Sequence, residues 1–311
     1  MNQMEHPLGG LTFGLFGKGG SGKSTVSIIL ARALVRAGYT VALIDADSSN
    51  HGIHSALGVS APGSLLDYFG GMVFSGGKVT CPVDDPTPLA GGAISLNDLP
   101  GGYSRRTAEG IIFLAAGKIG SAGPGAGCDG PISKIARDLV VTDLPVPAVT
   151  LLDFKAGLED SARGVLTAVD RALVVVDPTA AAIQLAIDLE STVARIHDGQ
   201  EPATSHLESL ELAEIARARY RQARVERVDA IVNRITGEQQ RQFIVASLKA
   251  HGVEVIGAIQ REAGIEEAWL TGARLGPGIG RFAGDGIVAA LEKTATGRNA
   301  GIVSDLSCSR P

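Results

Sequence analysis

Apolar stretches of strand length alternate along the chain with longer segments in which apolar positions recur at helical spacing. Several of the short stretches are almost continuously apolar, which is typical of strands covered on both faces of a sheet. The strand-like stretches are 11–17, 40–47, 110–117, 148–157, 171–179, 228–234 and 255–260, and helical patterns cover 24–38 and 238–252. This alternation predicts an α/β protein with a single doubly wound, mostly parallel sheet flanked by helices.

The expected domain organisation follows from where this pattern is interrupted. Residues 58–144 are rich in Gly, Pro and Asp and contain 110–117 as one clear strand. Loops of this length inside a compact domain are usually functional or mobile, so we expect a loop-rich insertion or interface region here. From residue 294 the composition becomes small and polar, which predicts a flexible tail at 294–311. We therefore expect one domain over residues 1–293.

Composition and charge argue against several classes of protein. The chain has 311 residues, of which 45% are hydrophobic, and its apolar runs end well short of the ~18 residues that a membrane span needs. The N-terminus lacks the apolar segment of a secretory signal. Three widely spaced cysteines are poor material for a disulfide framework, and a net charge of −5 gives no sign of a nucleic-acid surface. We expect a cytoplasmic protein without nucleic-acid partners or a stable membrane association.

A phosphate-binding loop is predicted at residues 17–24, Gly-Lys-Gly-Gly-Ser-Gly-Lys-Ser, which lie between a predicted strand and a predicted helix. This stretch satisfies the G-x-x-x-x-G-K-[ST] pattern, whose backbone N–H groups curl around phosphate oxygens. Lys23 is expected along the β- and γ-phosphates, and the Ser24 hydroxyl on Mg²⁺. The expected ligands are therefore ATP and Mg²⁺. Nucleotide contacts are predicted for Gly17, Gly19, Gly20, Ser21, Gly22, Lys23, Ser24 and Thr25.

That pattern does not require a second lysine, yet Lys18 is present. The arrangement K-G-G-S-G-K-S-T resembles the deviant Walker A motif of the MinD/ParA/nitrogenase-iron-protein superfamily, which belongs to the SIMIBI class of P-loop NTPases. The resemblance implies that Lys18 reaches across a dimer interface to the partner's phosphates and stabilises charge there, much as an arginine finger does. It also implies an ATPase that forms a homodimer on binding ATP. The plainer alternative for Lys18 is a solvated loop lysine.

Three other stretches agree with the resemblance. Asp45 and Asp47 match the D-x-D that follows the second strand in the superfamily, where one carboxylate orients the attacking water; we favour Asp45, with Asp47 in support. Asp153 matches the Walker B aspartate that holds Mg²⁺ through water, and Gly157 lies in the turn that follows it. Asn233 matches an asparagine on the adenine edge. Each of these residues also has a plainer reading as an ordinary strand-end, cap or turn residue.

A finer resemblance is carried by "LLDFKAGLEDSARG" and "VALIDADSSNHGIHSALG". Both look like CooC-type ATPases, which assist nickel insertion into carbon monoxide dehydrogenase and bind metal through a Cys-x-Cys pair at the dimer interface. Here Cys128 matches one cysteine, and Gly130 stands where the second would be. The resemblance implies a transition metal, nickel or zinc, on one Cys128 per subunit, with Cys81 as a candidate partner. The alternative for Cys128 is a small buried hydrophobe.

Other candidate ligands have plainer interpretations. His51 and His54 have a spacing that allows chelation, but they follow the D-x-D, where a switch segment or a helix cap is the simpler reading. Asp84 and Asp85 lie between two prolines and are interpreted as turn residues. Cys308, in the expected tail, is interpreted as inert.

The leading functional hypothesis is an ATP-hydrolysing dimerisation switch that assists metal insertion into a client metalloenzyme, a nickel enzyme like carbon monoxide dehydrogenase being the first guess. A positioning or segregation ATPase of the MinD or ParA kind is the runner-up, but the sequence shows neither a basic amphipathic C-terminal helix nor a basic stripe. An electron-transfer ATPase like the nitrogenase iron protein is the third option. It needs cysteines for a shared Fe–S cluster, and the cysteine expected after the Walker B strand is absent.

Overall fold

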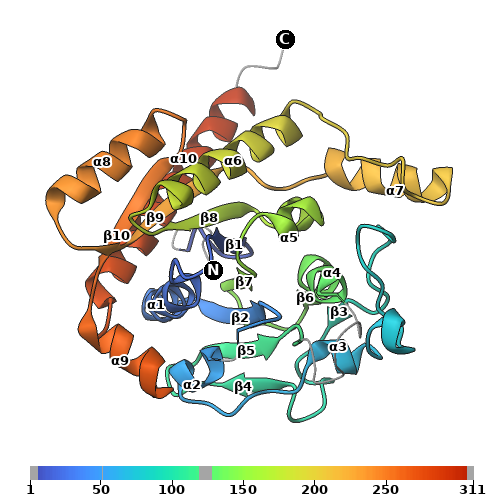
Figure 1. The fold of residues 1–311 in the computed structure, drawn as a ribbon, viewed down its shortest axis with the longest axis horizontal. Coiled ribbons are helices and arrows are strands. Elements are labelled where there is room, and N and C mark those ends of the chain that lie inside the picture. The colour runs from blue at the N-terminus through green and yellow to red at the C-terminus, as the bar shows by residue number, and fades with distance from the viewer. Residues whose placement is uncertain (1–5, 51, 119–127, 307–311) are drawn as a thin grey trace.

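The computed structural model describes residues 6–50, 52–118 and 128–306, of which 296–306 are described as backbone only. An eight-stranded sheet runs through the middle of the molecule, with helices on both sides (Figure 1). Seven neighbouring strands are parallel, and β4 is antiparallel to β5 at one edge. In spatial order the strands are β10 (Glu254–Gln260), β9 (Val228–Ile235), β8 (Arg171–Val176), β1 (Thr12–Gly17), β7 (Ala148–Phe154), β2 (Thr40–Ala46), β5 (Ile112–Ala115) and β4 (Ser104–Arg106).

Each face of the sheet is covered by its own hydrophobic core. Successive side chains of a strand point to opposite faces, so Leu15 packs into one core and Phe16 into the other. The first core is covered by α1 (Lys23–Arg36), α2 (Ile53–Leu57), α9 (Ala263–Thr271) and α10 (Arg281–Leu306). The second is covered by α3 (Leu65–Tyr68), α4 (Gly130–Asp138), α6 (Ala180–His197) and α8 (Glu238–Lys249). Two further helices are α5 (Glu159–Ala162) and the peripheral α7 (Leu210–Arg221).

The predicted fold class is confirmed, and the structure adds two details to the expected organisation. The section 58–144, expected to be loop-rich with one clear strand, supplies the edge of the main sheet, where β5 lies beside β2 and β4 lies beside β5. A short pair of strands, β3 (Ala93–Ile94) and β6 (Val140–Val141), also involves this section. The segment expected to be a tail from residue 294 begins inside α10, which continues to Leu306. Among the described ranges, no helix combines the length and the apolar character that crossing a bilayer requires.

The strand register gathers the predicted functional residues at one edge of the sheet. β1 lies between β7 and β8, and Asp45 of β2 is directly opposite Asp153 of β7. Because these strands are parallel, their carboxyl ends meet at the same edge, where the chain leaves β1 for the loop that precedes α1. In open α/β sheets this edge is where ligands bind.

Candidate nucleotide-binding site

The loop between β1 and α1 has a shape that only glycine permits at two positions. Gly17 has φ 150°, and a Cβ there would lie 2.6 Å from the carbonyl oxygen of Val175. Gly22 has φ 92°, and a Cβ there would lie 2.3 Å from Nδ2 of Asn233. The Asn233 amide itself donates to the Ser21 carbonyl oxygen at 2.8 Å. Gly22 therefore lets Asn233 of β9 approach the loop closely, and both glycines allow the loop its curved backbone conformation.

Two polar groups inside this loop lack strong partners. Lys23 is 6% exposed, and its ammonium donates to the Gly17 carbonyl oxygen over a long 3.4 Å. Burial lowers the pKa of Lys23, although Asp153 and other carboxylates oppose this. The Ser21 hydroxyl is fully buried without a hydrogen-bond partner among the described residues. A buried, weakly partnered cation at the N-terminus of a helix fits a phosphate group.

Hard oxygen donors lie next to Lys23. Asp153 is fully buried, and its carboxylate accepts hydrogen bonds from the Ser24 hydroxyl at 2.7 Å and the Ser27 hydroxyl at 2.9 Å. Asn50 donates to the Ser24 hydroxyl at 2.6 Å. Burial raises the pKa of Asp153, while the hydroxyl bonds and Lys23 oppose the rise. A serine hydroxyl and a carboxylate beside a phosphate-binding loop are ligands that suit Mg²⁺.

The two aspartates of the D-x-D occupy different positions. Asp45 is buried, accepts from the backbone N–H of Asp47 at 3.1 Å, and forms an ion pair with Lys118 at 2.6 Å. Burial raises the pKa of Asp45 to about 7, against the opposing effect of Lys118. Asp47 lines the cavity described below and accepts from the backbone N–H of Ser49 at 2.9 Å. Asp47, rather than Asp45, therefore faces the space beside the loop.

A cavity of about 380 Å³ adjoins the loop. Its walls come from the loop and the start of α1, the ends of β9 and β10, and α9. Asn233 lines it, and so does Trp269, whose indole N–H donates to the Thr25 hydroxyl at 2.8 Å. The Trp269 ring packs against Gly52, where a larger residue would not fit, because a Cβ there would lie 2.4 Å from the Trp269 side chain. The cavity thus combines a phosphate-binding end with a partly apolar end of a kind that accommodates a base.

Lys18 and Gly157, both predicted as site residues, lie beside this cavity rather than in its lining. The Lys18 side chain is 40% exposed, and its ammonium is 3.7 Å from the carboxylate of Asp177 in the same chain. Gly157 has φ 93°, and its N–H donates to the Gly17 carbonyl oxygen at 3.1 Å.

The two described cysteines are brought together although 81 and 128 are far apart in sequence. Cys81 packs against Gly130, where a Cβ would lie only 2.5 Å from the Cys81 sulfur. Burial raises the pKa of Cys81, and the nearby Cys128 acts in the same direction. Cys128 is partly exposed, and both thiols are free. Within the described ranges, no group of three or more His, Cys, Asp or Glu side chains is arranged to hold a metal ion.

Only one of the two histidines considered as metal ligands, His54, lies among the described residues. His54 lies in the short helix α2, whereas His51 and Cys308 lie outside the described residues.

Several residues of the site were not predicted individually, among them Asn50, Trp269 and Lys118. Asn50 was within reach of sequence reasoning, because it closes the stretch Asp-Ala-Asp-Ser-Ser-Asn at residues 45–50, inside the segment that resembles CooC-type ATPases. Trp269 is the single tryptophan of the chain, but nothing in its local pattern indicates a ligand cavity. Lys118 follows Asp45 by 73 residues, and no motif joins them.

The comparison with known families agrees with this geometry. The nucleotide-binding domain of the CobQ/CobB/MinD/ParA family matches residues 15–275. The chain belongs to this family. The family includes P-loop ATPases, so the predicted superfamily is confirmed.

Relatives and solved structures extend the match. An uncharacterized ATP-binding protein of Methanocaldococcus jannaschii is 34% identical over 176 residues, which cover 56% of this chain and 70% of that protein. The carbon monoxide dehydrogenase accessory protein CooC of Rhodospirillum rubrum is 34% identical over 189 residues, covering 56% of this chain and 65% of CooC. The predicted similarity to CooC is thereby confirmed.

Among solved structures, the cell division ATPase MinD of Pyrococcus furiosus has 18% identity and a TM-score of 0.58, covering 92% of this chain and 99% of that one. The septum site-determining protein MinD of Pyrococcus horikoshii OT3, complexed with Mg-ADP, has 16% identity and a TM-score of 0.59, covering 92% and 97%. At these identities the similarity establishes a shared fold.

Proposed function

We propose that this protein is an ATPase that binds ATP with Mg²⁺ and pairs with a second copy of itself in that state. The observation that carries the proposal is the buried, weakly partnered ammonium of Lys23 beside a cavity and beside the Ser24–Asp153 pair. Lys23 and the backbone N–H groups of the loop would hold the phosphates. Ser24 would bind Mg²⁺ directly and Asp153 through water, and the metal would neutralise charge that develops on the phosphates.

Water activation is assigned to the D-x-D. The sequence favoured Asp45, but Asp47 lines the cavity while Asp45 lies behind it in contact with Lys118. We therefore propose that the two carboxylates act together, Asp47 nearer to the nucleotide and Asp45 behind it. Asn233 and Trp269 would border the base.

Lys18 supplies the proposed link between nucleotide and dimer. Its ion pair with Asp177 is long, at 3.7 Å, and the Lys18 side chain is exposed, while the buried Asp177 carboxylate also accepts a hydrogen bond from the Thr179 hydroxyl at 3.1 Å. A long ion pair to an exposed lysine contributes little stability. Lys18 can therefore leave Asp177 at small cost and place its charge on the phosphates bound by a second copy.

The test measures self-association and turnover together. Asp47→Asn is expected to keep ATP bound and to accumulate a dimer with ATP and Mg²⁺, detected by light scattering after size-exclusion chromatography. Lys18→Ala is expected to stay monomeric with ATP and to lose at least about tenfold in turnover, which corresponds to roughly 1.4 kcal/mol. Lys249→Ala, an exposed lysine on α8, is the matched control. Unchanged association and turnover in Lys18→Ala would contradict the dimer mechanism.

We further propose that the ATPase serves the maturation of a metalloenzyme, with nickel or zinc as cargo. Support comes from the similarity to CooC of Rhodospirillum rubrum and from the two neighbouring thiols. Gly130 lacks a side chain, and the sulfur of Cys81 packs into the space beside it, so one chain offers two neighbouring sulfur atoms, those of Cys81 and Cys128. Thiolates suit nickel and zinc. Because thiols must lose a proton to bind metal, binding should strengthen as pH rises.

Metal binding is tested by competition with a chromophoric chelator, using nickel(II) and zinc(II) with and without a non-hydrolysable ATP analogue. Cys128→Ser and Cys81→Ser are each expected to weaken binding by at least about tenfold, and Cys308→Ser is the matched control. Equal metal affinity in wild type and Cys128→Ser would remove the cargo proposal and leave the ATPase proposal intact.

A further inference from the structure

Lys118 reaches the nucleotide site from the far side of the D-x-D. β5 pairs with β2 in parallel, with Ala115 opposite Asp45, and the N–H of Ala116 donates to the Asp45 carbonyl oxygen at 2.8 Å. The chain leaves β5 at the same edge of the sheet as β2. This register brings Lys118 beside Asp45, although the two residues are far apart in sequence.

One ammonium contacts both aspartates of the motif. Lys118 donates to Oδ2 of Asp45 at 2.6 Å and to the carbonyl oxygen of Asp47 at 2.5 Å. The other carboxylate oxygen of Asp45 accepts from the N–H of Asp47. The side chain of one aspartate and the backbone of the next are therefore held by the same cation, and their relative positions are fixed together.

Lys118 is absent from the lining of the cavity, so its effect on the nucleotide is indirect. The Asp45 side chain is only 4% exposed, and a carboxylate buried to this extent is costly without a cation partner. Loss of the lysine would leave Asp45 to turn away or to take up a proton. Either response disturbs Asp47, which lies two residues further along the chain, donates its backbone N–H to the Asp45 carboxylate and faces the cavity.

We propose that Lys118 is a positioning residue for ATP hydrolysis, which holds the Asp45–Asp47 segment in the geometry that directs the attacking water. This inference rests on the proposed ATPase function. Its distinctive consequence is a separation of two quantities: removing Lys118 lowers kcat, while the affinity for ATP changes little.

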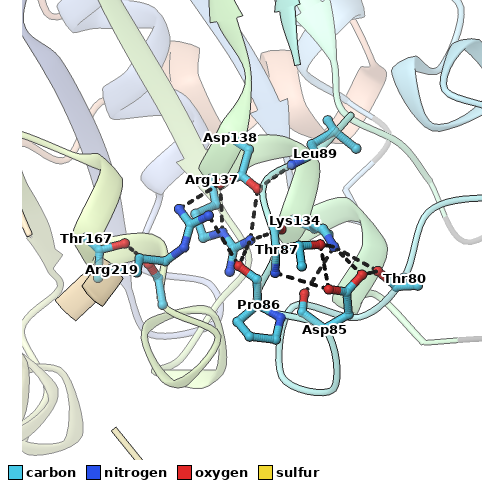
Figure 2. Close-up of polar contacts among 11 residues, drawn as sticks. Thr80, Asp85, Pro86, Thr87, Leu89, Lys134, Arg137, Asp138, Thr167 and Arg219 are labelled. Atoms are coloured by element: carbon cyan, nitrogen blue, oxygen red, sulfur yellow. Dashed lines mark hydrogen bonds and ion pairs between the residues drawn. The ribbon is translucent and has the colours of Figure 1, made fainter. Parts of the chain in front are cut away.

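The chain contains a matched lysine outside the site. Lys134 on α4 donates to Oδ2 of Asp85 at 2.8 Å and to the Asp85 carbonyl oxygen at 3.0 Å (Figure 2). Its side chain is 4% exposed. Like Lys118, it joins one carboxylate to one backbone carbonyl, but its hydrogen bonds go to Thr80, Asp85 and Thr87 rather than to the D-x-D. Replacing Lys134 therefore measures the structural cost of losing such a contact without touching the D-x-D.

The experiment compares Lys118→Met, Lys118→Gln, Lys118→Arg and Lys134→Met in the full chain. Steady-state hydrolysis gives kcat and KM, Trp269 fluorescence gives the affinity for ATP, and urea unfolding gives stability. Lys118→Met and Lys118→Gln are expected to lower kcat at least about tenfold with ATP affinity within about threefold of wild type. Lys118→Arg, which keeps the charge and the donors, is expected to recover most of the loss. Lys134→Met is expected to lower stability with kcat within about twofold.

Several outcomes would overturn the inference. One is an unchanged or higher kcat in both uncharged variants. Another is a loss of ATP affinity equal to the loss of kcat. A third is a kcat in Lys134→Met as low as in Lys118→Met. Should Lys118→Met fail to fold, the comparison of Lys118→Gln with Lys118→Arg decides. Absence of hydrolysis by the wild-type protein would instead remove the proposed function itself, so the two failures are distinguishable.

Discussion

Asp85 shows how a single side chain can organise a loop of the 58–144 section. Its carboxylate accepts from the N–H of Thr87 at 3.1 Å, as the interpretation of a turn residue requires. It also accepts from the Thr80 hydroxyl at 2.6 Å and from the buried Lys134, whose placement no local pattern indicates (Figure 2). The Asp85 carboxylate thus stabilises its own turn and also fixes α4 to this loop through Lys134.

We predict that Asp85→Asn lowers the free energy of unfolding at pH 7 by about 1–3 kcal/mol, because Lys134 loses its charged partner. Burial acts to raise the pKa of Asp85, but bonds from Lys134, Thr80 and Thr87 outweigh it and hold the pKa well below its usual range. A carboxylate whose pKa is depressed on folding stabilises the protein above its unfolded pKa, and this contribution is lost as pH falls below it.

The pH dependence provides the check on that prediction. The difference in urea midpoint between wild type and Asp85→Asn should be constant from pH 7 to about pH 4 and should shrink as pH falls further, since the contribution of Asp85 declines from its unfolded pKa of about 3.9 down to its depressed folded pKa. A difference between the two proteins that stays constant below about pH 4 would contradict the assignment of the ion pair.

At the scale of elements, α10 packs on α1 through a glycine. A Cβ at Gly284 would lie 2.9 Å from Ile29 Cγ2 and 3.2 Å from the Cβ of Ala33. Gly286, two residues later in the same helix, is exposed and has nothing within 4 Å of the corresponding position. The close approach of the two helices therefore depends on one glycine and not on its neighbour.

We predict opposite effects of the same substitution at these two positions. Gly284→Ala should lower the free energy of unfolding by about 1–3 kcal/mol, because the added methyl group forces the helices apart. Gly286→Ala should raise it by about 0.5–1 kcal/mol, because alanine favours the helix and meets no neighbour. Urea unfolding of both variants is the measurement, and destabilisation of equal size at both sites would contradict the packing argument.

At the scale of the whole molecule, the nucleotide site joins segments from both halves of the chain. The cavity is bordered by the loop after β1 and by the ends of β9 and β10, more than two hundred residues later. A ligand that binds these segments in the folded protein alone must stabilise the whole fold.

Thermal unfolding with ATP and Mg²⁺ tests this coupling. At a free ligand concentration of about one hundred times Kd, binding adds about 2.7 kcal/mol, which should raise Tm by roughly 4 °C in a chain of this size. Lys23→Ala should abolish the increase, because the phosphates lose their buried cation. An equal increase in Lys23→Ala would show that ATP binds elsewhere.

The sequence was a good guide wherever the information is local. The alternation of apolar stretches predicted all seven strands that were named, and the Gly-Lys-Gly-Gly-Ser-Gly-Lys-Ser stretch predicted the loop between β1 and α1. It missed β4, because Ser104–Arg106 is a short polar edge strand without an apolar run. It also predicted a tail where α10 continues. Helix propagation is cooperative, so a segment of weak propensity can extend a helix whose first turns are packed against the sheet and α1.

What the sequence by itself determined is therefore the set of elements, the parallel sheet, the phosphate-binding loop and the superfamily, since these depend on spacing along the backbone. Only the tertiary structure decided which side chains meet. Strand order and register placed Lys118 on Asp45, seated Cys81 against Gly130 and turned Lys18 toward Asp177. Contacts of this kind join residues that no local pattern relates, because the distance between them in space is set by the packing of the whole sheet.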